Sequence, residues 1–76
     1  MDIHKEVDAR GLNCPLPILR AKKALADMAS GQVLRVTATD PGAPGDFAAF
    51  CRQTGNVLAD SQTTPDGKFV MVLRRK

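Results

Sequence analysis

Two cysteines are the side chains of this 76-residue chain best suited to covalent chemistry, and their surroundings differ. Cys14 opens the segment Cys-Pro-Leu-Pro at positions 14–17, between a predicted strand and a predicted helix. Cys51 falls inside a predicted helix beside aromatic residues. A cysteine reacts through its thiolate, which needs exposure and nearby positive charge. Cys14 is therefore the candidate nucleophile.

The position of Cys14 at the predicted start of a helix favours its ionised form. A helix N-terminus presents unpaired backbone N–H groups and the positive end of the helix dipole. Arg10 and Arg20 are close in sequence and could add positive charge. We therefore expect the pKa of Cys14 to lie below the value of about 8.5 for a free thiol. The alternative is an incidental cap residue, although Asn13 is the better cap by residue type.

Two prolines stiffen the segment that contains Cys14. Pro15 disfavours helical geometry at Cys14, which is therefore expected to be a cap residue with its side chain pointing outward. Proline is tolerated in the first turn of a helix, and Pro17 restricts Leu16 in the same way. The helix could begin at Pro15 or at Pro17, and in both cases the thiol is held in one place.

Cys51 shares a helical face with Phe47, Phe50 and Thr54. A buried cysteine behaves as a small hydrophobic residue, so we predict that Cys51 packs in the core. The alternative is a resolving thiol for Cys14. Two cysteines and one distant histidine do not make a four-ligand zinc set, so we expect no metal and no cofactor.

The apolar pattern predicts the elements that must position these cysteines. Strict alternation indicates strands, and apolar residues three or four apart indicate helices. Clusters of glycine and proline at 40–45 and 65–67 separate them. The predicted elements are a strand near 3–9, a helix at roughly 15–29, a strand at about 33–39, a helix around 47–54, a strand opening at 57–59 and a strand at 69–73.

This order is β-α-β-α-β-β and predicts an α/β two-layer sandwich. Because βα crossovers are right-handed, both helices should pack on one face of the sheet. We expect one domain over residues 1–76. A domain of this size buries only about 60% of the surface its unfolded chain exposes, which leaves no room for a deep active-site cavity. A carrier, adaptor or binding module is therefore favoured over a free-standing enzyme.

Composition and charge limit the class of protein and the cellular location that we expect. Hydrophobic residues make up 43% and charged residues 25% of the chain, as is usual for soluble globular domains. No apolar run approaches the ~18 residues of a membrane span, and the N-terminus lacks a signal-peptide core. With only two cysteines, we expect a cytoplasmic protein with no membrane association. The net charge is +3, with basic clusters at 20–23 and 74–76. These basic side chains either lie on the surface in contact with water or attract an acidic protein partner or RNA.

The run Asp-Ala-Arg-Gly-Leu-Asn-Cys-Pro-Leu-Pro at positions 8–17 resembles the signature of the TusA/SirA-like family of small sulfur carriers. Further matches are Thr-Asp-Pro-Gly at 39–42 and Phe-Cys-Arg-Gln-Thr-Gly at 50–55, so the resemblance covers essentially the whole chain. Leu16 departs from the acidic residue of some tRNA-pathway members, and Asn56 departs from the His of many members. These departures leave the pathway open.

The resemblance implies a mixed four-stranded sheet of order 1-2-4-3, with the fourth strand antiparallel to the others. It implies a sulfurtransferase-type carrier whose Cys14 accepts a persulfide sulfur from a cysteine desulfurase or rhodanese-type donor. The sulfur then passes to an acceptor protein in tRNA thiolation, molybdenum cofactor assembly or sulfur oxidation. The supporting motif residues would be Arg10, Asn13, Pro15, Pro17 and Arg20.

Two other functions compete with the carrier. The fold is similar to that of a translation-factor C-terminal domain, and the basic tail could contact RNA. Single-strand binders usually stack bases on aromatic residues, however, and this chain has three Phe and no Tyr or Trp. A thiol–disulfide regulator would need Cys51 as its resolving cysteine. We expect a monomer without specific nucleic acid binding.

Overall fold

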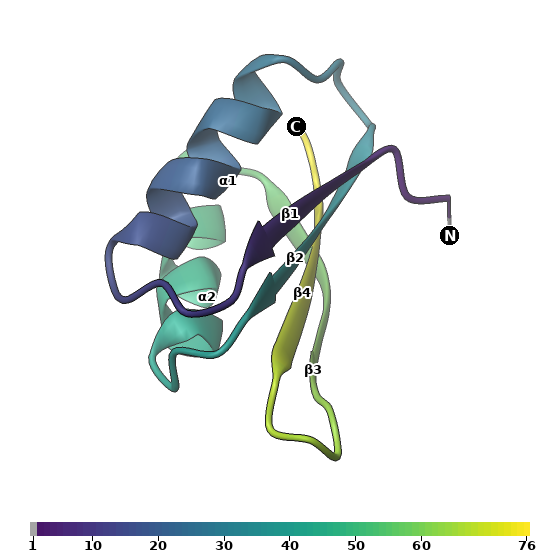
Figure 1. Cartoon of the computed structure of the whole chain (residues 1–76). Helices are drawn as coiled ribbons and strands as arrows, with labels where there is room; N and C mark the ends of the chain where they lie inside the picture. The colour runs from purple at the N-terminus through teal and green to yellow at the C-terminus, as the bar shows by residue number, and fades with distance from the viewer. Residues whose placement is uncertain (1) are drawn as a thin grey trace.

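Two helices lie against one face of a four-stranded sheet in the computed structural model, which describes residues 2–76 (Figure 1). This confirms the predicted two-layer α/β sandwich and its β-α-β-α-β-β order. The elements are β1 (Lys5–Ala9), α1 (Leu16–Ala26), β2 (Val33–Ala38), α2 (Ala43–Thr54), β3 (Val57–Thr63) and β4 (Phe69–Arg74).

The sheet is mixed, with the strand order β1-β2-β4-β3 that the family resemblance implies. β1 and β2 are parallel neighbours joined through α1, whereas β4 runs antiparallel to both β2 and β3. Parallel pairing of β1 and β2 brings their C-terminal ends to the same edge of the sheet. The turn before α1 and the loop before α2 therefore lie side by side.

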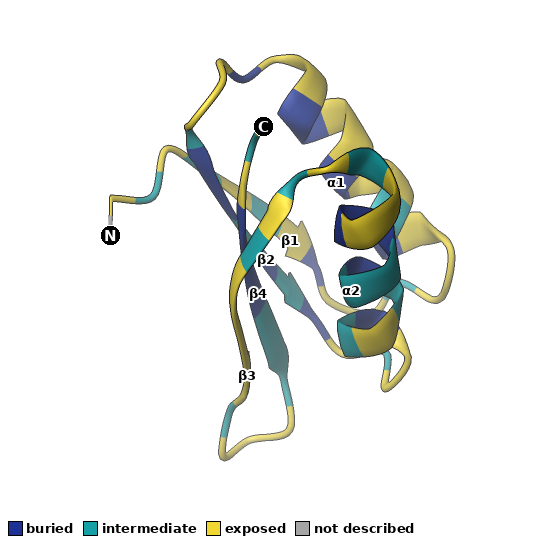
Figure 2. Ribbon diagram, turned by 180° about the vertical axis from the view of Figure 1, so that it is seen from behind, coloured by how far each residue is buried: buried dark blue, intermediate teal, exposed yellow. Residues whose placement is uncertain are grey.

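The core fills the space between the sheet and the two helices. The residues coloured as buried lie mostly in the central strands and in the two helices (Figure 2). Each large apolar side chain there contributes roughly 1.5–3 kcal/mol relative to exposure. The rings of Phe47 and Phe50 meet edge to face at 6.4 Å, and Phe69 packs against the core half-buried. None of the three Phe therefore offers a free ring for base stacking. The largest fully buried side chains are Phe47, Leu34, Met71, Leu73 and Val36.

Helix boundaries differ from the sequence predictions for local reasons. α1 begins at Leu16, between the two predicted starts, and ends at Ala26 rather than near residue 29. α2 begins at Ala43, four residues before the predicted start, with Pro44 in its first turn. Proline is accepted there because the N–H it lacks would have no helical partner. The cluster of proline and glycine at 40–45 predicts only a break between two elements, whereas in the structure α2 begins within it.

Candidate functional site

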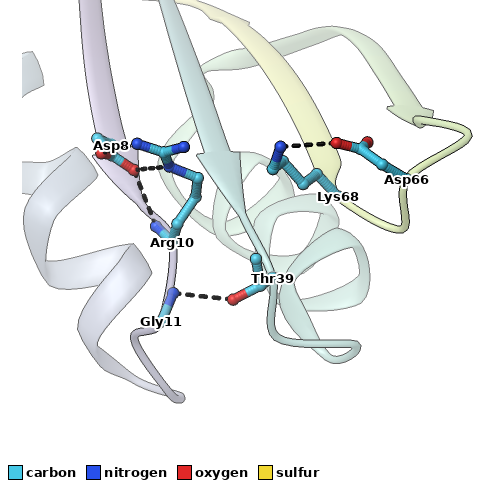
Figure 3. Close-up of polar contacts among 6 residues, drawn as sticks. All are labelled: Asp8, Arg10, Gly11, Thr39, Asp66 and Lys68. Carbon is cyan, nitrogen blue, oxygen red and sulfur yellow. Dashed lines mark hydrogen bonds and ion pairs between the residues drawn. The ribbon is translucent and has the colours of Figure 1, made fainter.

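Cys14 lies exposed and free in the turn between β1 and α1. Its backbone N–H donates a hydrogen bond to Oδ2 of Asp40 at 3.0 Å, and Oδ1 of Asp40 accepts one from Gly42 at 3.2 Å. The N–H of Gly11 donates to Oγ1 of Thr39 at 2.8 Å (Figure 3). Two hydrogen bonds thus fasten the Cys14 turn to the loop after β2. Asp40 therefore positions the backbone of Cys14, as well as bracing the start of α2.

The start of α1 contains no side-chain cap. Pro15 is the N-cap residue, so the prediction that Cys14 or Asn13 caps the helix is wrong. Asn13 contributes its backbone carbonyl instead, which accepts a hydrogen bond from the N–H of Leu16 at 2.8 Å. Pro17 is buried in the first turn, and the Cys14–Pro15 peptide bond is cis. Pro17 thus anchors the helix start in the core, whereas Cys14 and Pro15 stay at the surface.

The charges that act on the Cys14 thiol are negative. The Asp46 carboxylate beside the thiol raises the pKa of Cys14 most, and desolvation and the negative charge of Asp40 raise it further. The predicted lowering of this pKa is therefore wrong for the resting protein. Asp46 stands in the first turn of α2, which the parallel β1–β2 pairing brings next to Cys14. The residues next to Cys14 in the sequence do not indicate that Asp46 lies beside it in the fold.

Neither Arg10 nor Arg20 shifts the pKa of the Cys14 thiol. The Nε and Nη2 atoms of Arg10 each donate to the carboxylate of Asp8 at 2.8 Å (Figure 3), and these bonds lower the pKa of Asp8 to about 2. Arg20 is exposed on α1. Neither guanidinium is among the groups that shift the pKa of Cys14. The two arginines therefore do not supply the positive charge that was expected to lower the pKa of Cys14, and any other supporting role stays a prediction.

A groove of ≈ 360 Å³ opens beside Cys14, between α1 and α2. Leu16 and Leu19 project from α1 next to the same turn and are 46% and 50% exposed. Exposed leucines of this kind suit contact with another protein better than contact with water. The groove is lined by Cys14, Pro15, Ile18, Lys22, Asp46, Ala49, Phe50, Gln53 and Thr54.

Cys51 is a core residue, as predicted, with 5% of its surface exposed. Burial raises the pKa of its thiol, so it is both inaccessible and un-ionised at neutral pH. Cys14 is therefore the thiol available to a partner. Within residues 2–76, no group of three or more His, Cys, Asp or Glu side chains could hold a metal ion. Over the same residues, no helix is long and apolar enough to cross a membrane.

Replacement of Asp46 by asparagine should lower the pKa of Cys14. The substitution removes the charge that raises this pKa most while keeping the side-chain size. The alkylation rate of Cys14, measured against pH, should show its midpoint at lower pH than in the unmodified protein. Asp60→Asn is the control, because Asp60 is an exposed β3 carboxylate outside the groups that act on Cys14. An unchanged midpoint in Asp46→Asn would show that Asp46 does not hold the thiol proton.

Comparisons with known proteins point to one family. The model of the family described as "Sulfurtransferase TusA" matches residues 5–75. The chain is 64% identical to the "Putative sulfur carrier protein NMA0882" of Neisseria meningitidis over 92% of its length and 93% of that protein. It is 58% identical to the "Sulfur carrier protein TusA" of Allochromatium vinosum over 97% of its length and 96% of that protein. A SirA-like protein from Desulfitobacterium hafniense has a similar structure, with a TM-score of 0.83 and 25% identity over 92% of this chain and 95% of that one.

Proposed function

The chain belongs to the TusA family of sulfurtransferases, and from that premise we propose that Cys14 carries sulfur as a persulfide between two partner proteins. The exposure of Cys14 at the mouth of an open groove carries this proposal. A relay needs a sulfur atom that a donor and an acceptor can reach in turn. It needs no enclosed pocket, which a domain of this size could hardly build.

The proposed transfer is an exchange at sulfur. The Cys14 thiolate attacks the terminal sulfur of a persulfide on the donor cysteine, a new S–S bond forms, and the donor's S–S bond breaks. The donor cysteine leaves as a thiolate, which takes up the proton that Cys14 has lost. A nucleophile of the acceptor then attacks the terminal sulfur of the Cys14 persulfide, and Cys14 leaves as a thiolate. One sulfur atom moves at each step, and no oxidant or reductant is consumed.

The Asp46 carboxylate gives this relay a protected resting state. With its pKa raised, Cys14 is held as the neutral thiol, which is less open to oxidation than a thiolate. Ionisation of Cys14 then depends on the partner that docks. In this proposal the donor is a cysteine desulfurase or rhodanese-type protein in the cytoplasm. The pathway that the protein serves, whether tRNA thiolation, molybdenum cofactor assembly or sulfur oxidation, depends on which acceptor protein takes the sulfur.

Mass spectrometry of the intact adduct tests the proposal. The purified protein is incubated with a cysteine desulfurase and cysteine, alkylated under non-reducing conditions and digested. The peptide that contains Cys14 should gain the mass of one sulfur atom, and a reductant should remove it. The Cys51 peptide should be unchanged, because that thiol is buried. An adduct confined to Cys51, or none on either cysteine, would overturn the proposal.

A further inference from the structure

A second hollow of ≈ 260 Å³ adjoins the groove beside Cys14 and includes Arg75 and Lys76 in its lining. Lys22, Phe50 and Thr54 line both hollows, so the two are neighbours on the surface formed by α1 and α2. The two hollows together are called here the helix groove. It has Cys14 near one end and Lys76 near the other.

The two ends of the helix groove carry opposite charge. At the Cys14 end the wall contains Asp46, and Asp40 lies behind it, bonded to the backbone of Cys14. Lys22 lines both hollows, whereas Arg75 and Lys76 line only the far one, whose lining contains no Asp or Glu. Phe50, which lines both hollows, supplies apolar surface between the ends.

The cations at the far end form no ion pair within residues 2–76 and are partly fixed in place. None of Lys22, Arg75 and Lys76 takes part in the ion pairs among residues 2–76, which involve four other basic side chains. The guanidinium of Arg75 donates from Nε to the backbone oxygen of Leu25 at 2.9 Å and from Nη1 to the backbone oxygen of Lys76 at 3.2 Å. The N–H of Lys76 donates to Oδ1 of Asn56 at 3.0 Å. The far end is therefore held in place, and the ammonium groups of Lys22 and Lys76 supply its positive charge for a ligand.

We propose that the helix groove binds an extended segment of a partner protein in which a basic residue adjoins the reacting cysteine and a carboxylate lies about five residues away. The spacing follows from α1, whose 11 residues at about 1.5 Å each span about 16 Å. An extended chain covers that length in about five residues at roughly 3.3 Å each. This inference rests on the proposed function, because it describes how the sulfur-exchanging partner is recognised.

Charge order favours a protein segment over nucleic acid in this groove. A phosphate backbone repeats one sign of charge and would meet Asp46 and Asp40 at the reacting end. A segment with both signs places its cation on these carboxylates and its carboxylate on Lys22 and Lys76. The partner cation would also weaken the grip of Asp46 on the Cys14 proton. Docking is thereby coupled to ionisation of the thiol.

Disulfide exchange with synthetic peptides tests the helix groove. Each eight-residue peptide carries one cysteine activated as a mixed disulfide with 2-thiopyridine. The Cys14 thiolate attacks the peptide sulfur, the S–S bond to the pyridine breaks, and the released thiopyridone is followed by its absorbance. The matched peptide has Arg beside the cysteine and Glu five residues on, and the swapped peptide exchanges the two. Rates are divided by those of free cysteine with the same peptide.

The matched peptide should react roughly tenfold faster than the swapped one, the ratio expected when two partly exposed charge contacts act together. Lys22→Glu and Lys76→Glu should each reduce this ratio severalfold. Lys23→Glu is the matched control, because Lys23 is an exposed neighbour on α1 with the same charge change that does not line the groove. It should leave the ratio unchanged.

Four outcomes would overturn this inference. A ratio near one would show that the order of charges does not matter. An equal reduction by Lys22→Glu and Lys23→Glu would reduce the effect to overall charge. Inhibition by a short RNA that Lys22→Glu abolishes would assign the groove to nucleic acid. A rate that falls as protein concentration rises would assign it to a second copy of the chain. The exchange uses no persulfide sulfur, so its failure is distinct from failure of the carrier proposal.

Discussion

Serine in place of Cys14 should reduce sulfur transfer through this protein to the background of the donor and acceptor alone. A serine hydroxyl does not ionise near neutral pH and cannot form a persulfide. The remaining thiol, Cys51, has 5% of its surface exposed and cannot meet a partner without local unfolding. The measurement follows labelled sulfur from cysteine, through a desulfurase and this protein, to an acceptor. The loss should be complete rather than graded, because the position supplies the reacting atom itself.

Cys51→Ala provides the matched control, because it removes the other thiol of the chain. Labelled sulfur should still pass through Cys14 in this variant. The free energy of unfolding should fall by about 1 kcal/mol, because a small buried group leaves the core. Transfer that survives Cys14→Ser and fails in Cys51→Ala would move the carrier role to Cys51. Both variants should be compared at temperatures well below the unfolding of the less stable one.

The fold could be predicted from the sequence because its signals are local and agree with one another. Leu34, Val36 and Ala38 alternate with polar residues, and all three are fully buried on one face of β2. Ile18, Ala21 and Leu25 recur at helical spacing and face the core of the structure. The strand order came from the family resemblance, since alternation alone does not tell which strands are neighbours.

The site could be predicted only in part, because some of its residues are far from Cys14 in the sequence. Cys14 could be found because its motif is continuous in sequence, and Cys51 because its helical face is apolar. Asp40 and Asp46 approach Cys14 from 26 and 32 positions away, through the parallel pairing of β1 and β2. Arg10 is near in sequence and yet pairs with Asp8. Proximity along the chain therefore gave the wrong sign for the charge around the thiol.

The basic C-terminus also has a structural role that charge alone does not reveal. The backbone of Arg75 bonds at both its N–H and its carbonyl, donating to Gln32 at 2.9 Å and accepting from Gly31 at 2.8 Å. Its side chain reaches the backbone oxygen of Leu25 in the last turn of α1. A cation at the C-terminus of a helix is favoured by the helix dipole. The tail thus joins β4 to the end of α1.

Deletion of Arg75 and Lys76 should therefore lower the free energy of unfolding by about 2–4 kcal/mol. It removes these three hydrogen bonds and the one from Lys76 to Asn56, each worth roughly 0.5–1.5 kcal/mol net, with less for those exposed to water. Urea unfolding followed by circular dichroism measures the change. If the deletion leaves the urea midpoint of unfolding unchanged, Arg75 and Lys76 are only charged surface residues and do not stabilise the fold.

Arg75→Ala and Arg74→Ala separate the structural contribution of the tail from its charge. Each removes one positive charge, but Arg74 is exposed and its side chain has no hydrogen bond in the described chain, whereas Arg75 caps α1. Arg75→Ala should cost about 1–2 kcal/mol, from the bond to Leu25 and the cation at the helix end. Arg74→Ala should stay within about 0.5 kcal/mol of the unmodified protein. Equal losses in the two variants would mean that net charge, and not the contact with α1, determines how the tail affects stability.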